Sequence, residues 1–458
     1  MEIPPMDVVT DEILTKLPAK SLMRFKCVSK LWSSYISSRY FSSRFHSFPS
    51  RPRPRLYMCL RDLSDHHNSM EIPPMDVVTD EILTKLPAKS LMRFKCVSKL
   101  WSSYISSRYF SSRFHSVPRL YMGLRDLNDS HNSVILSLAP ETTSSSCFVV
   151  DHDLTIPQRG GAILQYLPGF ICYTFWGKPR IYNPATRHLV TFPAAIKSNI
   201  IITPPPGEGA KVVSYYFGHD HVSDQYVVVC STGVRTRFRQ EMRSEHRVFF
   251  LEAGGRGIWK KAAPTCPADF RPHIPVKGGV CIDGVIYYLG WTDSYNSVLV
   301  SFHIRSGEFK MIQVPRRDGD ELRSRVTDVS LIEYGGKVTL IVQSNLREKG
   351  RLDLWAVEDA GSNKWSRKTL VLQPSQLHLV NNDTIFKVNG TTQNGKVFLI
   401  PENLFSPFHI LCYDLQSNDM RKIEIKGVPD HWFSKDKMNV IVMLMDHSER
   451  LLNVMHTG

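Results

Sequence analysis

The chain has 458 residues, of which 42% are hydrophobic, so it is long enough for one large core plus a smaller unit. Its net charge is +14, but the 57 basic residues form no dense block, which favours a solvated surface over a nucleic-acid interface. The acidic start, broken by Pro4 and Pro5, does not fit a secretory signal, and no apolar run approaches the roughly 20 residues of a membrane span. We therefore expect an intracellular protein of the nucleus, the cytoplasm or both, with no membrane partner.

The cysteines and histidines do not form patterns typical of metal or redox chemistry. The nine cysteines include no Cys-x-x-Cys pair, and most lie in apolar runs where a thiol behaves as a small hydrophobe. Two groups of histidines, His66-His67 and His219-Asp220-His221, lack further ligands at metal-site spacing. We expect no disulfide framework, no metal and no other cofactor.

An internal repeat dominates the first quarter of the chain. Residues 70–116 repeat residues 1–47 without a difference, and the copies diverge only over a short insertion before they resume at 56–63 and 120–127. Identity over such a length indicates a recent copying event or an error in the gene model, because the units of an old array would have diverged.

Each copy has the apolar spacing of short helices. In the second copy Val78, Ile82 and Leu86 recur at steps of three and four, and Pro87 ends the run. A second helical stripe follows, with Ser98 placed to cap a new helix in its middle, at Leu91, Phe94, Val97, Trp101 and Ile105. We predict three short helices per copy, a unit that is marginally stable unless it packs against the rest of the chain or a partner.

The second copy resembles a plant-type F-box through the strings IPPxDVV, EIL, LPxKSL and RFxCVSKxW between Ile72 and Trp101. This resemblance implies that the helices dock onto a Skp-type adaptor, which bridges to a cullin, and that the protein is the substrate receptor of a ubiquitin ligase. The gap from Pro74 to Ile82 is one residue longer than in the commonest F-box, which leaves the register of the first helix open.

The same resemblance implies ten adaptor-contact positions in each copy, and the alternative for any one of them is a packing role within the module. In the second copy they are Pro74, Val78, Ile82, Leu83, Leu86, Pro87, Leu91, Cys96, Val97 and Trp101, and in the first copy Pro5, Val9, Ile13, Leu14, Leu17, Pro18, Leu22, Cys27, Val28 and Trp32. Only the second copy continues directly into a strand-like region, so we expect it to be the working one.

After residue 133 the apolar period changes from helical to alternating. Hairpin patterns recur at 164–173, 280–288, 331–340 and 386–399, each followed by a second hairpin. Counting a degenerate unit at 134–157 gives about six four-stranded units, as in a β-propeller, and a two-sheet sandwich is the alternative. The apolar stretch Val440 to Met445 is placed to pair with the first unit and close the ring.

The alternating region also resembles the F-box-associated (type 3-like) domain of plant proteins, most clearly at 169–172, 182–187, 279–289 and 354–360. Pattern and resemblance together predict an α + β multidomain chain. Its expected parts are a first F-box copy at 1–47, a linker at 48–69, a second F-box copy at 70–116, a connector at 117–133 and a propeller-like substrate-recognition domain at 134–458.

The strand order predicts where a target protein would bind. Because successive strands alternate in direction, the turns between second and third strands all open on one face, at 175–179, 231–247, 290–296, 344–350 and 402–408. Loops that present aromatic and Arg side chains on a rigid scaffold commonly form recognition surfaces. The candidate substrate-face residues, for which solvated loop positions are the alternative, are Trp176, Arg235, Arg237, Arg239, Trp291, Tyr295, Arg347 and Phe405.

These observations favour a non-catalytic receptor subunit that binds a Skp-type adaptor, a cullin through that adaptor, and an unidentified protein substrate. The sequence contains no G-x-S-x-G, HExxH or P-loop motif, which disfavours an enzyme that uses the propeller cleft. A third interpretation is a protein, or a non-functional duplicate, that binds the adaptor without delivering a substrate.

Overall fold

The structure is a computed structural model. It describes residues 37, 91, 95, 99–106, 110, 119–126, 133–141, 147–157, 162–167, 169–175, 177–184, 187–196, 211–235, 241–251, 257–262, 270–292, 296–315, 329–380, 384–391, 395–402, 406–433 and 440–447. The chain divides into two compact units, residues 1–117 with 450–452 and residues 118–449 with 453–458.

The first unit is helical where it is described. Helix α6 (Lys99–Ser106) lies within the second apolar stripe of the repeated module and has a buried face at Ile105. Tyr104 contacts the ring of Phe110 edge-on, with 5.4 Å between the ring centroids, and Leu91 is fully buried. The helical prediction is therefore confirmed for this stretch. Among the described helices, none is long and apolar enough to cross a membrane.

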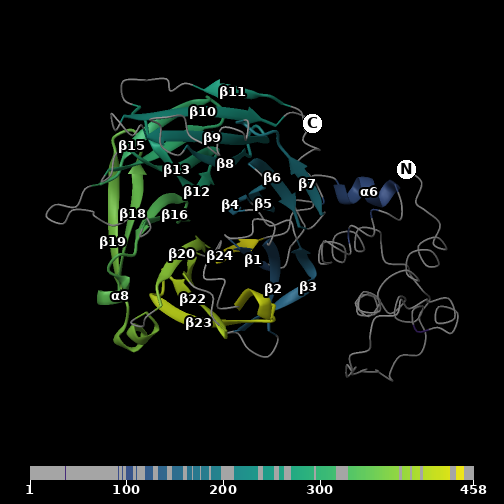
Figure 1. Ribbon diagram of the computed structural model, residues 1–458, viewed down its shortest axis with the longest axis vertical. Coiled ribbons are helices and arrows are strands. Elements are labelled where there is room, and N and C mark those ends of the chain that lie inside the picture. The colour runs from purple at the N-terminus through teal and green to yellow at the C-terminus, as the bar shows by residue number, and fades with distance from the viewer. Residues whose placement is uncertain are drawn as a thin grey trace, which may run out of the picture. The chain divides into compact units, whose positions relative to one another are not determined.

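The second unit contains four separate four-stranded antiparallel sheets (Figure 1). Blade two contains β4 (Ala162–Leu167), β5 (Phe170–Phe175), β6 (Lys178–Asn183) and β7 (His188–Thr191). Blade three contains β8 (Val212–Asp220), β9 (Gln225–Arg235), β10 (Met242–Phe250) and β11 (Trp259–Ala262). Blade four contains β12 (Ile274–Ile282), β13 (Val285–Trp291), β14 (Ser297–His303) and β15 (Glu308–Gln313). Blade five contains β16 (Val329–Tyr334), β17 (Lys337–Val342), β18 (Arg351–Asp359) and β19 (Lys364–Val371).

The remaining eight strands form one sheet that consists of two blades joined at their outer edges. Blade six contains β20 (Phe386–Thr391), β21 (Lys396–Pro401), β22 (Phe408–Asp414) and β23 (Asp419–Lys426). Blade one contains β24 (Val440–His447), β1 (Arg119–Asp126), β2 (Ser133–Pro140) and β3 (Cys147–Pro157). A short parallel pairing of β23 with β3 links the two blades. Six blades confirm the propeller prediction over the sandwich alternative.

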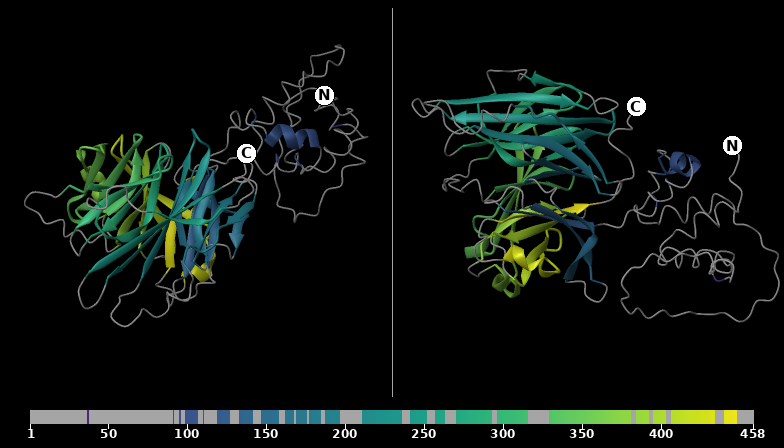
Figure 2. Two further views of the ribbon diagram at one scale, coloured as in Figure 1. Left: turned by 90° about the horizontal axis from the view of Figure 1, so that it is seen from above. Right: turned by 45° about the vertical axis from the view of Figure 1, so that its right-hand side comes forward.

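The ring is closed by β24, the last of the described strands. Strand β24 pairs antiparallel with β1 along its whole length, from Arg119 opposite His447 to Asp126 opposite Val440 (Figures 1 and 2). It occupies the inner position of blade one and adjoins β20 and β4 of the two flanking blades. The closure predicted for Val440 to Met445 is thus confirmed.

Strand β1 lies within the segment 117–133 that we had interpreted as a connector, so that interpretation was wrong for the strand itself. Leu120, Met122 and Leu124 of β1 alternate and are fully buried in the core of blade one. The strand pairs with β2 on one side and with β24 on the other. Its apolar alternation is short and flanked by arginines, which is why it resembled a connector in the sequence.

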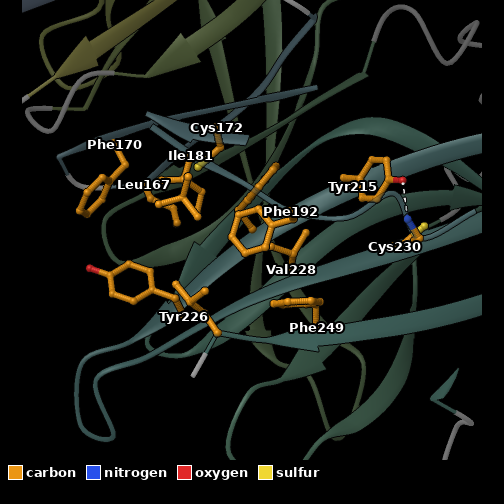
Figure 3. Packing of buried hydrophobic residues seen from close by; sticks show 14 of the residues in the cluster. Leu167, Phe170, Cys172, Ile181, Phe192, Tyr215, Tyr226, Val228, Cys230 and Phe249 are labelled. Carbon is orange, nitrogen blue, oxygen red and sulfur yellow. Dashed lines mark hydrogen bonds between the residues drawn. The ribbon is translucent and has the colours of Figure 1, made fainter. Parts of the chain in front are cut away.

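Apolar and aromatic side chains fill the space between adjacent blades. Between blades two and three, Phe170 meets Tyr226 and Phe192 meets Phe249, both edge-on, with ring centroids 5.7 and 5.3 Å apart (Figure 3). An edge-on pair of aromatic rings is stabilised electrostatically, in addition to the stabilisation from the apolar area that the rings bury. Each blade is thereby held in a fixed position against the next, which makes the ring a rigid scaffold for its turns.

Two short helices lie in the loops at one end of the ring. Helix α8 (Leu346–Lys349) joins β17 to β18 and ends at Gly350, which has a left-handed backbone with φ of 58°. This backbone conformation favours glycine, and a Cβ on Gly350 would also require the side chain of Leu377 in η8 (Pro374–Leu379) to move. A further turn of 3₁₀ helix, η9 (Asp430–Phe433), precedes β24.

Candidate recognition face

One end of the ring collects two classes of loop. Because strands alternate in each blade, the turns between second and third strands share an end with the connectors between blades. Hydrogen bonds join the two classes, since the Tyr215 hydroxyl donates to the Gly177 carbonyl (2.9 Å) and accepts from the Ala195 amide (3.3 Å). We call this end the recognition face, with described residues 177, 192–196, 211, 241, 270–273, 292, 296, 314–315, 343–350, 372–380, 384–385, 402, 406–407 and 427–433. The connectors are absent from the sequence prediction of this face.

Three of the eight candidate substrate-face residues are described. Arg235 is the half-buried last residue of β9, Trp291 is the half-buried last residue of β13, and Arg347 is exposed on α8. They lie on blades three, four and five, all at the end of the ring that carries the recognition face. The Nε1 atom of Trp291 is buried and has no hydrogen-bond partner among the described residues.

The turn that we predicted at 231–247 is mostly strand. Strands β9 and β10 continue to a pairing of Arg235 with Met242, which leaves only residues 236–241 between them. Ser231, Thr232 and Val234 are buried, because β9 lies between two blades and its polar residues face neighbouring chain rather than water. Arg235 therefore projects from a strand end and not from a flexible loop.

The other candidate residues remain predictions. Trp176, Arg237, Arg239, Tyr295 and Phe405 lie outside the described residues. The first F-box copy is likewise outside them at all ten positions, and in the second copy only Leu91 and the backbone of Trp101 are described. Leu91 is fully buried within its helical unit. Burial is what the alternative of a packing role within the module predicts, and contact of Leu91 with an adaptor stays a prediction.

A buried histidine pair lies between blades three and four. His246 of β10 and His273, just before β12, stack with their ring centroids 5.1 Å apart. His273 Nε2 is 3.2 Å from the Tyr288 hydroxyl, whereas neither ring nitrogen of His246 has a partner among the described residues. Burial lowers the pKa of His246 to about 3 and the pKa of His273 to about 4, so both rings are neutral at pH 7. The pair is a packing element.

Blade five contains an ionic cluster that the sequence pattern did not predict. The Asp353 carboxylate is buried and accepts hydrogen bonds from Arg351, Arg367 and Thr369. Arg351 begins β18 at the recognition face, Asp353 and Thr369 pair two residues further in, and Arg367 lies in the middle of β19 opposite Trp355. The available signal is the alternation Arg351-x-Asp353, which places both side chains on one face of a strand whose following residues, 354–357, are apolar.

The described part of the chain contains no group of three or more His, Cys, Asp or Glu side chains arranged to hold a metal ion. Its five cysteines are free thiols, three of them buried. Burial raises the pKa of Cys230 to about 12 and that of the half-buried Cys281 to about 11, so both thiols are poor nucleophiles. The chemistry that this end of the ring offers is hydrogen bonding and charge complementarity from fixed side chains.

Comparison with protein families assigns both units. The F-box domain matches residues 7–44 and again 76–113, and the F-box associated beta propeller domain matches residues 119–448. The chain belongs to the F-box-associated β-propeller family. An F-box/LRR-repeat protein of Arabidopsis thaliana is 48% identical to this F-box protein. The match covers 78% of this chain and 82% of the relative's chain. A second Arabidopsis F-box protein is 43% identical over 88% of this chain and 98% of its own.

Among solved structures, this F-box protein is similar to a lectin of Aleuria aurantia in complex with a fucosylated sugar. The similarity covers 70% of this chain and 98% of the lectin, at 12% sequence identity and a TM-score of 0.38.

Proposed function

We propose that this F-box protein is the non-catalytic substrate receptor of an SCF-type ubiquitin ligase. One F-box binds a Skp-type adaptor and, through it, a cullin, while the propeller binds a target protein on its recognition face. The observation that carries the proposal is the order of the two matched domains. Only residues 114–118 separate the second F-box match from the propeller match. So short a connection would hold a bound target within a narrow range of distances from the adaptor.

The proposal assigns adaptor binding to the second F-box copy. The two copies share every residue, so their difference must come from position, and only the second is joined directly to the propeller. The first copy is a tethered spare in this proposal, because it is not joined directly to the propeller that would hold a target. Deletion of residues 1–69 should therefore leave adaptor binding almost unchanged.

The duplication supplies a matched pair of variants for the test. Leu86→Ala with Pro87→Ala alters the second copy, and Leu17→Ala with Pro18→Ala makes the same change in the first. Adaptor retained on the purified chain is then measured for each. We expect the second-copy variant to lose most of the adaptor and the first-copy variant to retain it. Retention by the second-copy variant with loss in the first would assign the function to the first copy.

The alternative is an adaptor-binding protein that delivers no substrate. It predicts the same result for the paired variants, but no protein would be ubiquitinated in a manner that depends on the recognition face. Comparing ubiquitinated proteins in cells that express the intact chain or Trp291→Ala with Arg347→Ala separates the two. Identical sets, with adaptor binding preserved, would favour the alternative.

A further inference from the structure

Strands β10 and β11, the two outer strands of blade three, differ in length, with nine and four residues (Figure 1). Strand β10 pairs with β9 along its whole length and starts with Met242 opposite Arg235. Strand β11 covers only the second half of β10, and its last pair is Ala262 opposite His246. Among the described residues, no strand pairs with 242–245 on the side away from β9. We call 242–245 the open edge of β10.

Proline explains why β11 ends where it does. If the strand continued beyond Ala262, the register would bring Pro264 opposite Ser244. Proline has no backbone N–H to donate to a ladder, so it disfavours pairing at that position. Strand β11 therefore stops before it covers the open edge.

The ladder with β9 decides which backbone groups the open edge presents. The Leu251 amide donates to the Tyr226 carbonyl at 2.9 Å, and these two residues lie opposite each other in the register that β10 and β9 keep without a shift. Hydrogen-bonded and non-hydrogen-bonded pairs alternate along an antiparallel ladder, so every second residue from Leu251 directs its N–H and C=O to β9. Met242 and Ser244 are not in that set. Their N–H and C=O groups therefore point away from β9, toward the open edge.

The strand behind the open edge is fixed in the core. Ser231, Thr232 and Val234 of β9 are buried. The Thr232 hydroxyl donates to the Glu245 carbonyl at 3.3 Å, which agrees with a Glu245 carbonyl that points to β9. A strand that is already held in an extended conformation loses less entropy when another strand pairs with it.

The side chains around the open edge are predominantly basic. The stretch 235–247 contains five arginines and two glutamates. Arg243 is exposed, whereas the Glu245 carboxylate already lies 4.0 Å from the Arg247 guanidinium. An acidic residue on an added strand would be a favourable neighbour of Arg243. Two copies of this chain paired edge to edge would instead bring like charges together, which disfavours a second copy as the occupant.

We infer that the open edge of β10 binds an extended, acidic segment of the target protein as an added β-strand. The site rests on the proposed receptor function and adds the class of target segment and how it is held. Backbone hydrogen bonds to Met242 and Ser244 supply affinity, and the surrounding arginines select acidic side chains.

Amide hydrogen exchange of the full chain, purified with its adaptor and read residue by residue, tests the open edge directly. The amides of Met242 and Ser244 should exchange much faster than those of Arg243 and Glu245, which bond to β9. Slow exchange of all four amides would show that the chain itself covers the edge, and would overturn the inference.

Binding is tested with immobilised random heptapeptide libraries that carry glutamate or lysine at the central position. We expect the glutamate library to capture the full chain preferentially. Peptides selected from it should protect the Met242 and Ser244 amides from exchange, and should lose binding when their central amides are N-methylated, because a methylated backbone cannot pair. Equal capture by both libraries, no capture, or undiminished binding of the methylated peptides would overturn the inference.

Two substitutions at one position locate the site. Ser244→Pro removes an outward N–H and leaves the hydrogen bonds to β9 in place, so binding of the selected peptides should weaken roughly tenfold or more. Ser244→Ala is the matched control, because it keeps the N–H and should bind like the original chain. Equal binding by the two variants would contradict the site.

A charge reversal decides if Ser244→Pro does not fold. Arg243→Glu keeps the backbone groups of the edge and changes only the exposed side chain. We expect it to shift capture from the glutamate library toward the lysine library, and an unchanged preference would contradict the site.

Two further readouts separate this site from other outcomes. Adaptor retained by each variant reports on the F-box, so intact adaptor binding without peptide capture refutes this site and leaves the receptor function standing. Light scattering reports self-association. A dimer of the intact chain that Ser244→Pro abolishes would assign the edge to a second copy and overturn the inference.

Discussion

At the residue scale, two glutamines join neighbouring blades. Gln165 of β4 donates from Nε2 to the Phe217 carbonyl (2.5 Å) and accepts from the Phe217 amide (2.8 Å), as a strand residue would. Gln343 does the same between blades five and six, with the Val388 amide at 2.8 Å and the Phe386 carbonyl at 3.1 Å. The sequence does not predict these roles, since a polar residue in a strand pattern usually faces water.

Gln165→Leu should destabilise the propeller because it leaves the amide and carbonyl of Phe217 buried without partners. Two such groups cost roughly 2–5 kcal/mol in the free energy of unfolding. Urea unfolding of the full chain measures the difference. Gln313→Leu is the control, since that side chain is exposed on β15, and its free energy should change by less than about 0.5 kcal/mol. Equal effects would show that Gln165 does not hold the blades together.

The histidine pair makes stability depend on pH. The folded pKa values of His246 and His273, about 3 and about 4, lie below the ordinary value of 6.5, so only the unfolded chain takes up these protons near pH 5. Stability is therefore complete above pH 6.5 and falls as the solution is acidified, by about 2 kcal/mol for each histidine at pH 5.

His246→Phe should remove one histidine's share of that pH dependence. The phenyl ring keeps the shape and needs no hydrogen bonds, so stability at pH 7 should stay within about 1 kcal/mol of the original. The change between pH 7 and pH 5, measured by urea unfolding at both, should shrink by about 2 kcal/mol. His221→Gln, an exposed control, should leave it unchanged. An undiminished pH dependence in His246→Phe would show that the ring is not held neutral.

At the element scale, hairpins with glycine turns could be predicted and others could not. Asp283-Gly284 and Gly335-Gly336 have positive φ at both residues, between 48° and 75°, which matches the turn that their sequences predict. The hairpin of β8 and β9 was missed because its turn, residues 221–224, contains no glycine and places Asp224 at φ 52° instead. In this propeller a hairpin can be predicted from the sequence when its turn contains glycine, and strand alternation alone is not enough.

The closing strand is the element whose loss should matter most. A chain that ends at residue 439 lacks β24 and exposes the unpaired edge of β1 in the inner ring. We expect that chain to unfold at much lower temperature or to aggregate, and a chain that ends at residue 447 to behave like the full one. Thermal unfolding and light scattering compare them. Equal stability of both truncations would mean that β24 does not close the ring.

At the scale of the whole molecule, an adaptor module and a recognition ring follow one another in a single chain. The sequence predicted both from the F-box strings and the repeated hairpins. It could not predict the Asp353 cluster, because that depends on which strand faces are brought together across β18 and β19. Contacts between side chains on two neighbouring strands can be identified only when the register of the two strands is known.

The most direct test of the receptor role is co-elution of the intact chain with a Skp-type adaptor and a cullin in size-exclusion chromatography. Circular dichroism first establishes that the chain is folded. We expect one peak that contains all three proteins, and loss of adaptor and cullin together from the Leu86→Ala, Pro87→Ala variant. A folded chain that elutes alone in the presence of both partners would contradict the receptor role.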